Sequence, residues 1–122
     1  MRNKRQIGAE KEKQVCAWLV AHGYRILKTN FCCRAGEIDI VACEEKYLVF
    51  LEVKYRSGMT QGMPEEAVDV RKQRAISRAA LFYMTRFQYP QTTPVRFDVV
   101  TILGEAPEKI TLYKNAFEFC GY

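Results

Sequence analysis

The sequence predicts an α/β fold with a mixed central sheet of about five strands covered by helices. Apolar residues recur at helical spacing in two segments, and shorter runs rich in β-branched and aromatic residues occupy most of the remainder. These segments follow one another as helix, three strands, helix and two strands. The length of 122 residues suffices for one compact domain and is too short for two, so we expect a single domain over residues 1–122.

The first helix is expected from Ile7 to His22, and Gly23 is placed to end it. Its buried stripe should consist of Val15, Trp18, Leu19 and His22. Glu10 lies one turn before Gln14 and borders this stripe. The Glu10 carboxylate is therefore either a rim residue whose stem packs on apolar surface, or a group aimed at a site beneath the helix.

Three strands are expected at Tyr24–Phe31, Glu37–Cys43 and Tyr47–Lys54, the last two joined by a turn at residues 44–46. Residues 56–62 are rich in Gly, Ser and Thr and are expected to form a loop. Two further strands are expected late in the chain, at Val95–Leu103 and Lys109–Tyr113.

The second helix is expected to begin at Pro64, because proline is well tolerated in a first helical turn. Lys72 falls on the apolar line of this helix. A lysine there can bury its stem and keep its ammonium in water. Alternatively, the ammonium reaches an acidic site on the sheet, and the sequence leaves both interpretations open.

The tripeptide Glu52-Val53-Lys54 ends the third strand and is the most informative pattern in the chain. Because side chains alternate between the two faces of a strand, Glu52 and Lys54 point the same way and lie about 7 Å apart. One face of the sheet therefore carries a carboxylate and an ammonium side by side.

The preceding strand adds two acids by the same rule. Glu37 and Asp39 are expected on one face, with Ile38 and Ile40 on the other. If the two strands pair as a hairpin, three acids and one lysine can converge. Carboxylate oxygens suit a hard divalent cation, and a nearby lysine can act on a phosphate or an attacking water. Without a cation, this crowding should raise the pKa of at least one of the acids.

The net charge of +5 is unevenly distributed. Between positions 71 and 86 the cations have no acid among them: Arg71, Lys72, Arg74, Arg78 and Arg86. A second basic cluster comprises Arg2, Lys4, Arg5, Lys11 and Lys13. Acids concentrated between two cationic clusters suit a metal site that must hold a polyanion such as nucleic acid. The competing interpretation is that these charges are ordinary solvated helix faces.

Composition excludes several other classes. No stretch approaches the ~20 apolar residues of a membrane span, and the N-terminus lacks a signal-peptide apolar run, so we expect a cytoplasmic protein without a membrane partner. The five cysteines are an odd number without a C-x-x-C pair, which indicates reduced thiols. A zinc site is disfavoured because His22 is the only histidine.

Several motifs occur together and in order along nearly the whole chain. They are Gly8-x-Glu10, Gly23-Tyr24, Asn30, Gly36-Glu-Ile-Asp39, Val49-Phe-Leu-Glu-Val-Lys54-x-Arg56, a helical Lys72 and Arg96-Phe-Asp98-Val. With these motifs the chain resembles the uncharacterised bacterial YraN-like family. That family is similar to the PD-(D/E)XK restriction-endonuclease-like nucleases and, among them, to archaeal Holliday-junction resolvases. The resemblance implies a restriction-endonuclease-like core and a Mg²⁺- or Mn²⁺-dependent endonuclease that hydrolyses phosphodiester bonds of DNA, branched and single-stranded forms being candidate substrates.

The resemblance also assigns roles to residues. Asp39 would be the metal-bridging carboxylate, Glu52 the second metal ligand and Lys54 the catalytic lysine. Glu10 matches the N-terminal helix acid, Glu37 is a further candidate ligand, and Lys72 is a second candidate catalytic lysine. Candidate nucleic-acid contacts are Arg56, Arg71, Arg74 and Arg78. A junction resolvase would need two sites and hence a homodimer.

Two rival functions remain, because a fold does not determine function. The first is a nucleic-acid-binding accessory protein of the same fold that cuts nothing. The second is an interaction protein in which Lys54 and Lys72 neutralise the acids in a structural ion-pair network. Divalent-cation binding separates the enzyme from the network, and cleavage of DNA separates it from the accessory.

Overall fold

The computed structural model describes residues 4–56, 68–104 and 109–121. Its elements, in chain order, are α1 (Lys4–Ala21), β1 (Arg25–Cys33), β2 (Gly36–Glu44), β3 (Tyr47–Arg56), α2 (Val70–Arg86), β4 (Val95–Leu103) and β5 (Lys109–Phe117). The predicted order of helices and strands is confirmed. None of the helices in these ranges is long and apolar enough to cross a membrane.

The five strands form one mixed sheet in the order β1-β2-β3-β4-β5. All neighbours are antiparallel except β3 and β4, which run parallel. A parallel pair needs a crossover connection, and α2 lies in the connection between β3 and β4. The predicted α/β class, with a mixed sheet flanked by helices, is confirmed and is consistent with a restriction-endonuclease-like core.

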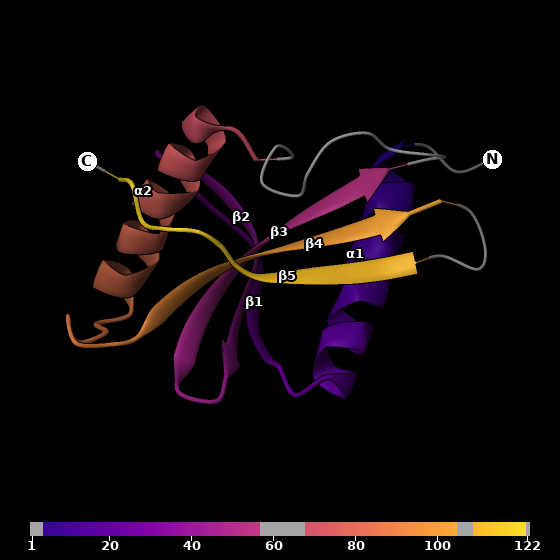
Figure 1. The fold of residues 1–122 in the computed structure, drawn as a ribbon. Helices are drawn as coiled ribbons and strands as arrows, with labels where there is room; N and C mark the ends of the chain where they lie inside the picture. Colours follow the sequence, from indigo (N-terminus) through magenta and orange to yellow (C-terminus); the bar gives the residue numbers. More distant parts are fainter. Residues whose placement is uncertain (1–3, 57–67, 105–108, 122) are drawn as a thin grey trace.

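The two helices cover opposite faces of the sheet (Figure 1). Val15 and Leu19 of α1 pack in one cluster with the buried residues Tyr24, Ile40, Ala42, Val49, Leu51, Val100 and Ile102. Ile76, Ala79, Ala80 and Tyr83 of α2 pack in the other, against Phe31, Ile38, Val41, Leu48, Phe50, Phe97 and Val99. We call these the α1 face and the α2 face. The buried residues of the strands are therefore apolar, apart from Glu44, Glu52 and Asp98.

The helix ends follow local chemistry, although α1 begins at Lys4, three residues before the expected start at Ile7. Gly23 has φ +94°, a conformation that suits glycine, and so ends α1 as predicted. His22, predicted to be buried, is exposed because α1 has already ended, and its Nδ1 lies 2.7 Å from the Trp18 carbonyl oxygen. The helix that carries Lys72 begins at Val70, whereas the predicted start at Pro64 lies outside the described residues.

The alternation expected along β2 breaks at Asp39. Ile38 packs on the α2 face and Ile40 on the α1 face, although regular alternation would place both on one side. The cause lies on β1, where Asn30 has φ +53° and interrupts the pairing with β2 between Phe31↔Ile38 and Thr29↔Ile40. The prediction that Ile38 and Ile40 share a face is therefore wrong, because two paired strands kink together at this point.

A buried ion-pair network lies on the α1 face. Asp98 is fully buried and accepts hydrogen bonds from Tyr24 Oη (2.8 Å), the Arg96 guanidinium (2.8 and 2.9 Å) and the Asn115 backbone N–H (2.9 Å). Arg96 also donates to Glu44 at 2.8 Å, and Lys114 donates to the other Glu44 oxygen at 2.8 Å. Each carboxylate here is matched by cationic donors at short range.

Candidate active site

Asp39 is held in the gap where β2 and β3 separate. Cα pairing between these strands stops at Ile40↔Leu51, although β3 continues to Arg56. Beyond that pair, the Asp39 carboxylate takes the place of a strand partner, because its Oδ2 accepts a hydrogen bond of 2.8 Å from the Val53 backbone N–H. This bond fixes the carboxylate against β3, next to Glu52.

Glu52 is a buried acid, with a relative exposure of 5%, and it lies on the α2 face. The pKa of Glu52 is raised to about 8, chiefly by burial and also by the charge of Asp39 and a hydrogen bond with Asp39, while the charges of Lys72 and Lys54 act in the opposite direction. At neutral pH the Asp39–Glu52 pair therefore retains a proton. The pKa of one of these acids is raised, as predicted, but burial is the largest cause and the charge of Asp39 is the second.

Two lysines approach Glu52 from different elements. Lys54 lies two residues further along β3 on the same face, as strand alternation predicts, while Val53 packs on the α1 face. Lys72 comes from the first turn of α2, where the Asp69 side chain accepts a hydrogen bond of 2.8 Å from the Lys72 N–H and caps the helix. The Lys72 ammonium lies 3.7 Å from Glu52 Oε2. The Lys72 side chain is 44% exposed, so it approaches the acidic pair and also stays in contact with solvent, and features of both interpretations are present.

Glu12 of α1 is a site acid that the sequence-based reasoning missed. Burial raises its pKa, and so do the charges of Asp39 and Glu37, whereas a hydrogen bond of 2.8 Å from Asn30 Nδ2 lowers it. Glu12 precedes the buried Val15 by three positions and Leu19 by seven, so helical spacing places all three on one face. That spacing was the signal in the sequence.

Glu10 and Glu37 differ from the predicted arrangement in position. Glu10 is exposed on α1, and its role as a metal ligand stays a prediction. Glu37 pairs across the strands with Cys32, next to the Phe31↔Ile38 pair on the α2 face, so it points to the α1 face. Asp39, in the gap, is the acid that acts electrostatically on both Glu12 and Glu52.

No three His, Cys, Asp or Glu side chains lie together as a preformed metal cage within residues 4–56, 68–104 and 109–121. All five cysteines are free thiols, as predicted, and Cys32 is the exposed one. The assignments of Asp39, Glu52, Glu10 and Glu37 as ligands remain predictions.

The predicted nucleic-acid contacts differ in exposure. Arg71 and Arg74 are exposed on the first half of α2, the half that also carries Lys72. Arg78 is exposed too, but its Nε donates a hydrogen bond of 3.3 Å to the Gly121 carbonyl, which ties it to the C-terminal tail. Arg56 is half-buried at the end of β3, where its carbonyl accepts from the Gly104 N–H at 2.8 Å. Arg71 and Arg74 are thus the better placed to meet a polyanion.

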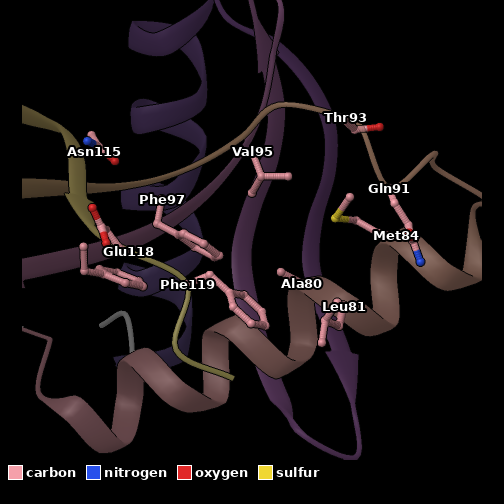
Figure 2. Close-up of a pocket in the computed structure, with 11 residues that line it drawn as sticks. Ala80, Leu81, Met84, Gln91, Thr93, Val95, Phe97, Asn115, Glu118 and Phe119 are labelled. Carbon is pink, nitrogen blue, oxygen red and sulfur yellow. The ribbon is translucent and has the colours of Figure 1, made fainter. Parts of the chain in front are cut away.

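A separate apolar groove of about 430 Å³ runs between α2 and the β4–β5 edge. Its walls, drawn in Figure 2, are Ala80, Leu81, Met84, Gln91, Thr93, Val95, Phe97, Asn115, Phe117, Glu118 and Phe119. None of the acids or lysines around Asp39 lines it. The groove is therefore a different surface from the candidate active site.

Comparisons with known proteins identify the family. The model of the uncharacterised protein family UPF0102 matches residues 11–102, a segment that includes Glu12, Asp39, Glu52, Lys54 and Lys72. The chain belongs to this family. A UPF0102 protein of Lachnoclostridium phytofermentans is 49% identical over 98% of both chains. A UPF0102 protein of Caldicellulosiruptor bescii is 42% identical over 94% of this chain and 99% of its own. The YraN-like resemblance is confirmed at the level of the UPF0102 family, whose printed names state no activity.

Proposed function

We propose that this protein is a divalent-cation-dependent nuclease that hydrolyses phosphodiester bonds of DNA, with branched and single-stranded DNA as candidate substrates. The observation that carries the proposal is the Asp39–Glu52 pair, in which a buried carboxyl group retains a proton next to a second carboxylate. A buried acidic pair of this kind is suited to bind a cation, because the charge of the cation offsets both the burial and the mutual repulsion that favour the protonated form.

Comparison with the ion-pair network on the α1 face supports this proposal over a structural role. In that network the pKa of Glu44 is lowered, chiefly by its hydrogen bond from Lys114, as expected when cations fully match an acid. The pKa of Glu52 is raised instead, and its ion pair with Lys72 is long at 3.7 Å. The lysines therefore do not neutralise the acidic pair, which argues against a purely structural network.

The donor set fits a hard cation such as Mg²⁺ or Mn²⁺, since the converging groups are carboxylates. Asp39 and Glu52 would hold it, with Glu12 as a further acid from α1 and Glu10 and Glu37 as the other predicted ligands. Such a cation lowers the pKa of a bound water and polarises a phosphate. Lys54 would orient the attacking water or offset negative charge that develops on the phosphate, and Lys72 would hold the Glu52 carboxylate in position.

The exposed Arg71 and Arg74 continue from Lys72 along the first turns of α2. Cations at this position can contact phosphates on either side of a scissile bond, which is consistent with a nucleic-acid substrate. A second copy of the chain would supply the second site that cutting a branched junction requires, so we include a homodimer in the proposal.

The test is a panel of duplex, single-stranded and branched DNA, incubated with Mg²⁺ or Mn²⁺ and the purified protein. The proposal expects cation-dependent cleavage by the wild type and none by Asp39→Asn. Nucleic-acid binding without cleavage in either cation would favour the accessory protein. A wild type that neither cuts nor binds a divalent cation would favour the structural network.

A further inference from the structure

Tyr55 has a partly exposed aromatic ring near the candidate active site. It follows Lys54 directly in β3 and has a relative exposure of 45%. The core tyrosines Tyr24 and Tyr83 have exposures of 3% and 5%. Burial in the hydrophobic core therefore does not account for an aromatic residue at position 55, because neither core cluster contains it.

The ring lies on the same side of the sheet as Glu12. Val53 packs on the α1 face, so Tyr55, two residues further along β3, points to that face as well. Lys11 of α1 places its ammonium 5.2 Å from the centre of the Tyr55 ring, and Lys11 immediately precedes Glu12. Asp39 lies between the two faces of β3, because its carboxylate accepts a hydrogen bond from the Val53 N–H, two residues before Tyr55, whereas Glu52 and Lys54 point to the α2 face.

An exposed aromatic face next to a lysine matches the chemistry of single-stranded nucleic acids. Bases stack on aromatic rings through their flat faces, and the ammonium can contact the adjoining phosphate. A base inside a duplex offers only its edges, because its faces are covered by neighbouring base pairs. An aromatic ring at this position would therefore bind a nucleotide whose base is unpaired and not stacked on neighbouring bases.

We infer that Tyr55, with Lys11 beside it, is the stacking site for an unpaired base next to the phosphate that would bind through a divalent cation held by Asp39 and Glu52. This inference rests on the proposed function and narrows it. The substrate class is a nucleic acid with an unpaired nucleotide adjacent to the cleaved bond, as at an overhang, a flap or a branch point, whereas an uninterrupted duplex would not use the site.

Binding in Ca²⁺ tests the inference without cleavage. The probes are a fully paired DNA duplex and the same duplex with a single-stranded overhang, each measured with wild type, Tyr55→Ala and Tyr55→Phe. Loss of one stacked base should weaken overhang binding by Tyr55→Ala about 5- to 150-fold. Tyr55→Phe keeps the ring and should bind as the wild type does. Duplex affinity should be the same for all three.

Phe87→Ala is a matched control. Phe87 is 50% exposed and has its own cation, the Arg86 guanidinium 5.7 Å from the ring centre. It lies 15 positions beyond Lys72, about 22 Å along the α2 axis and far from the acidic site. Its loss should leave overhang binding unchanged, so that an effect of Tyr55→Ala cannot be ascribed to any exposed aromatic.

The possible outcomes distinguish the stacking site at Tyr55 from the proposed nuclease function. Equal overhang affinity of wild type and Tyr55→Ala overturns the stacking site, as does an equal loss on both probes or a wild type that binds neither. A wild type that prefers the overhang through Tyr55, yet cuts no DNA in Mg²⁺ or Mn²⁺, supports the stacking site and refutes the nuclease.

Discussion

Replacing Glu52 by glutamine should change how stability depends on pH. The pKa of Glu52 rises from an ordinary 4.5 to about 8 in the folded protein, mainly through burial. Between these values the folded state holds a proton that the unfolded chain releases, so stability falls as pH rises from about 4.5 to about 8 and is level above that. At about 1.4 kcal/mol per pKa unit, ionising Glu52 costs the metal-free protein up to about 5 kcal/mol.

Movement of Lys54 and Lys72 toward the ionised carboxylate would lower this cost of ionisation. We therefore expect the measured loss of unfolding free energy to be about 2–5 kcal/mol. Glu52→Gln resembles the protonated acid in shape and cannot ionise. The variant should match the wild type near pH 5 and exceed it at pH 9. Since other titrating groups are common to both proteins, the difference between the two curves isolates Glu52.

The assay is urea unfolding at pH 5, 7 and 9 in a chelating buffer, with unfolding free energies extrapolated to water. Glu45→Gln serves as the control, because Glu45 is exposed in the turn between β2 and β3 and should follow the wild type. A difference between wild type and Glu52→Gln that does not vary with pH would mean that Glu52 is ionised throughout, and the reasoning would be refuted.

In the wild type, Mg²⁺ affinity should also rise by up to tenfold per pH unit below pH 8, as each bound cation displaces a proton.

Four further changes test other parts of the structure. Asp39→Asn should weaken Mg²⁺ or Mn²⁺ binding by at least tenfold in calorimetry without lowering the metal-free melting temperature, since it relieves repulsion; equal affinity would remove it from the ligand set. Lys54→Met should abolish cleavage while DNA affinity in Ca²⁺ stays within about threefold, and cleavage at the wild-type rate would end its catalytic role. Replacing Arg71 and Arg74 together by alanine should reduce the salt dependence of duplex binding by about two phosphate contacts, and an unchanged slope would place DNA elsewhere. Asp98→Ala should destabilise the protein by about 3–5 kcal/mol in urea, because it leaves a buried guanidinium partly unpaired; a loss below about 1 kcal/mol would contradict this account of the network.

Local sequence patterns predicted most of the secondary structure. The bounds of β4 match the sequence-based expectation, and those of β1, β2 and β3 differ from it by no more than two residues at either end, because short-range alternation and turn residues mark strands well. The last strand continues to Phe117, four residues beyond the expected end. Its extension depends on pairing with β4, which the local pattern of Lys114 and Asn115 does not reveal.

By itself, the sequence determined that Glu52 and Lys54 share a face and that Lys72 lies on the side of its helix that is turned toward the sheet, since both follow from the repeat of a single element. Only the tertiary structure determined which acidic side chains lie close together. The kink at Asn30 and Asp39 involves two paired strands, and it moves Asp39 into the gap beside Val53. Likewise, Glu12 comes within electrostatic range of Asp39 only because α1 packs against the sheet. Spacing along one element limits where a side chain can point, but the distance between side chains of different elements depends on how those elements pack.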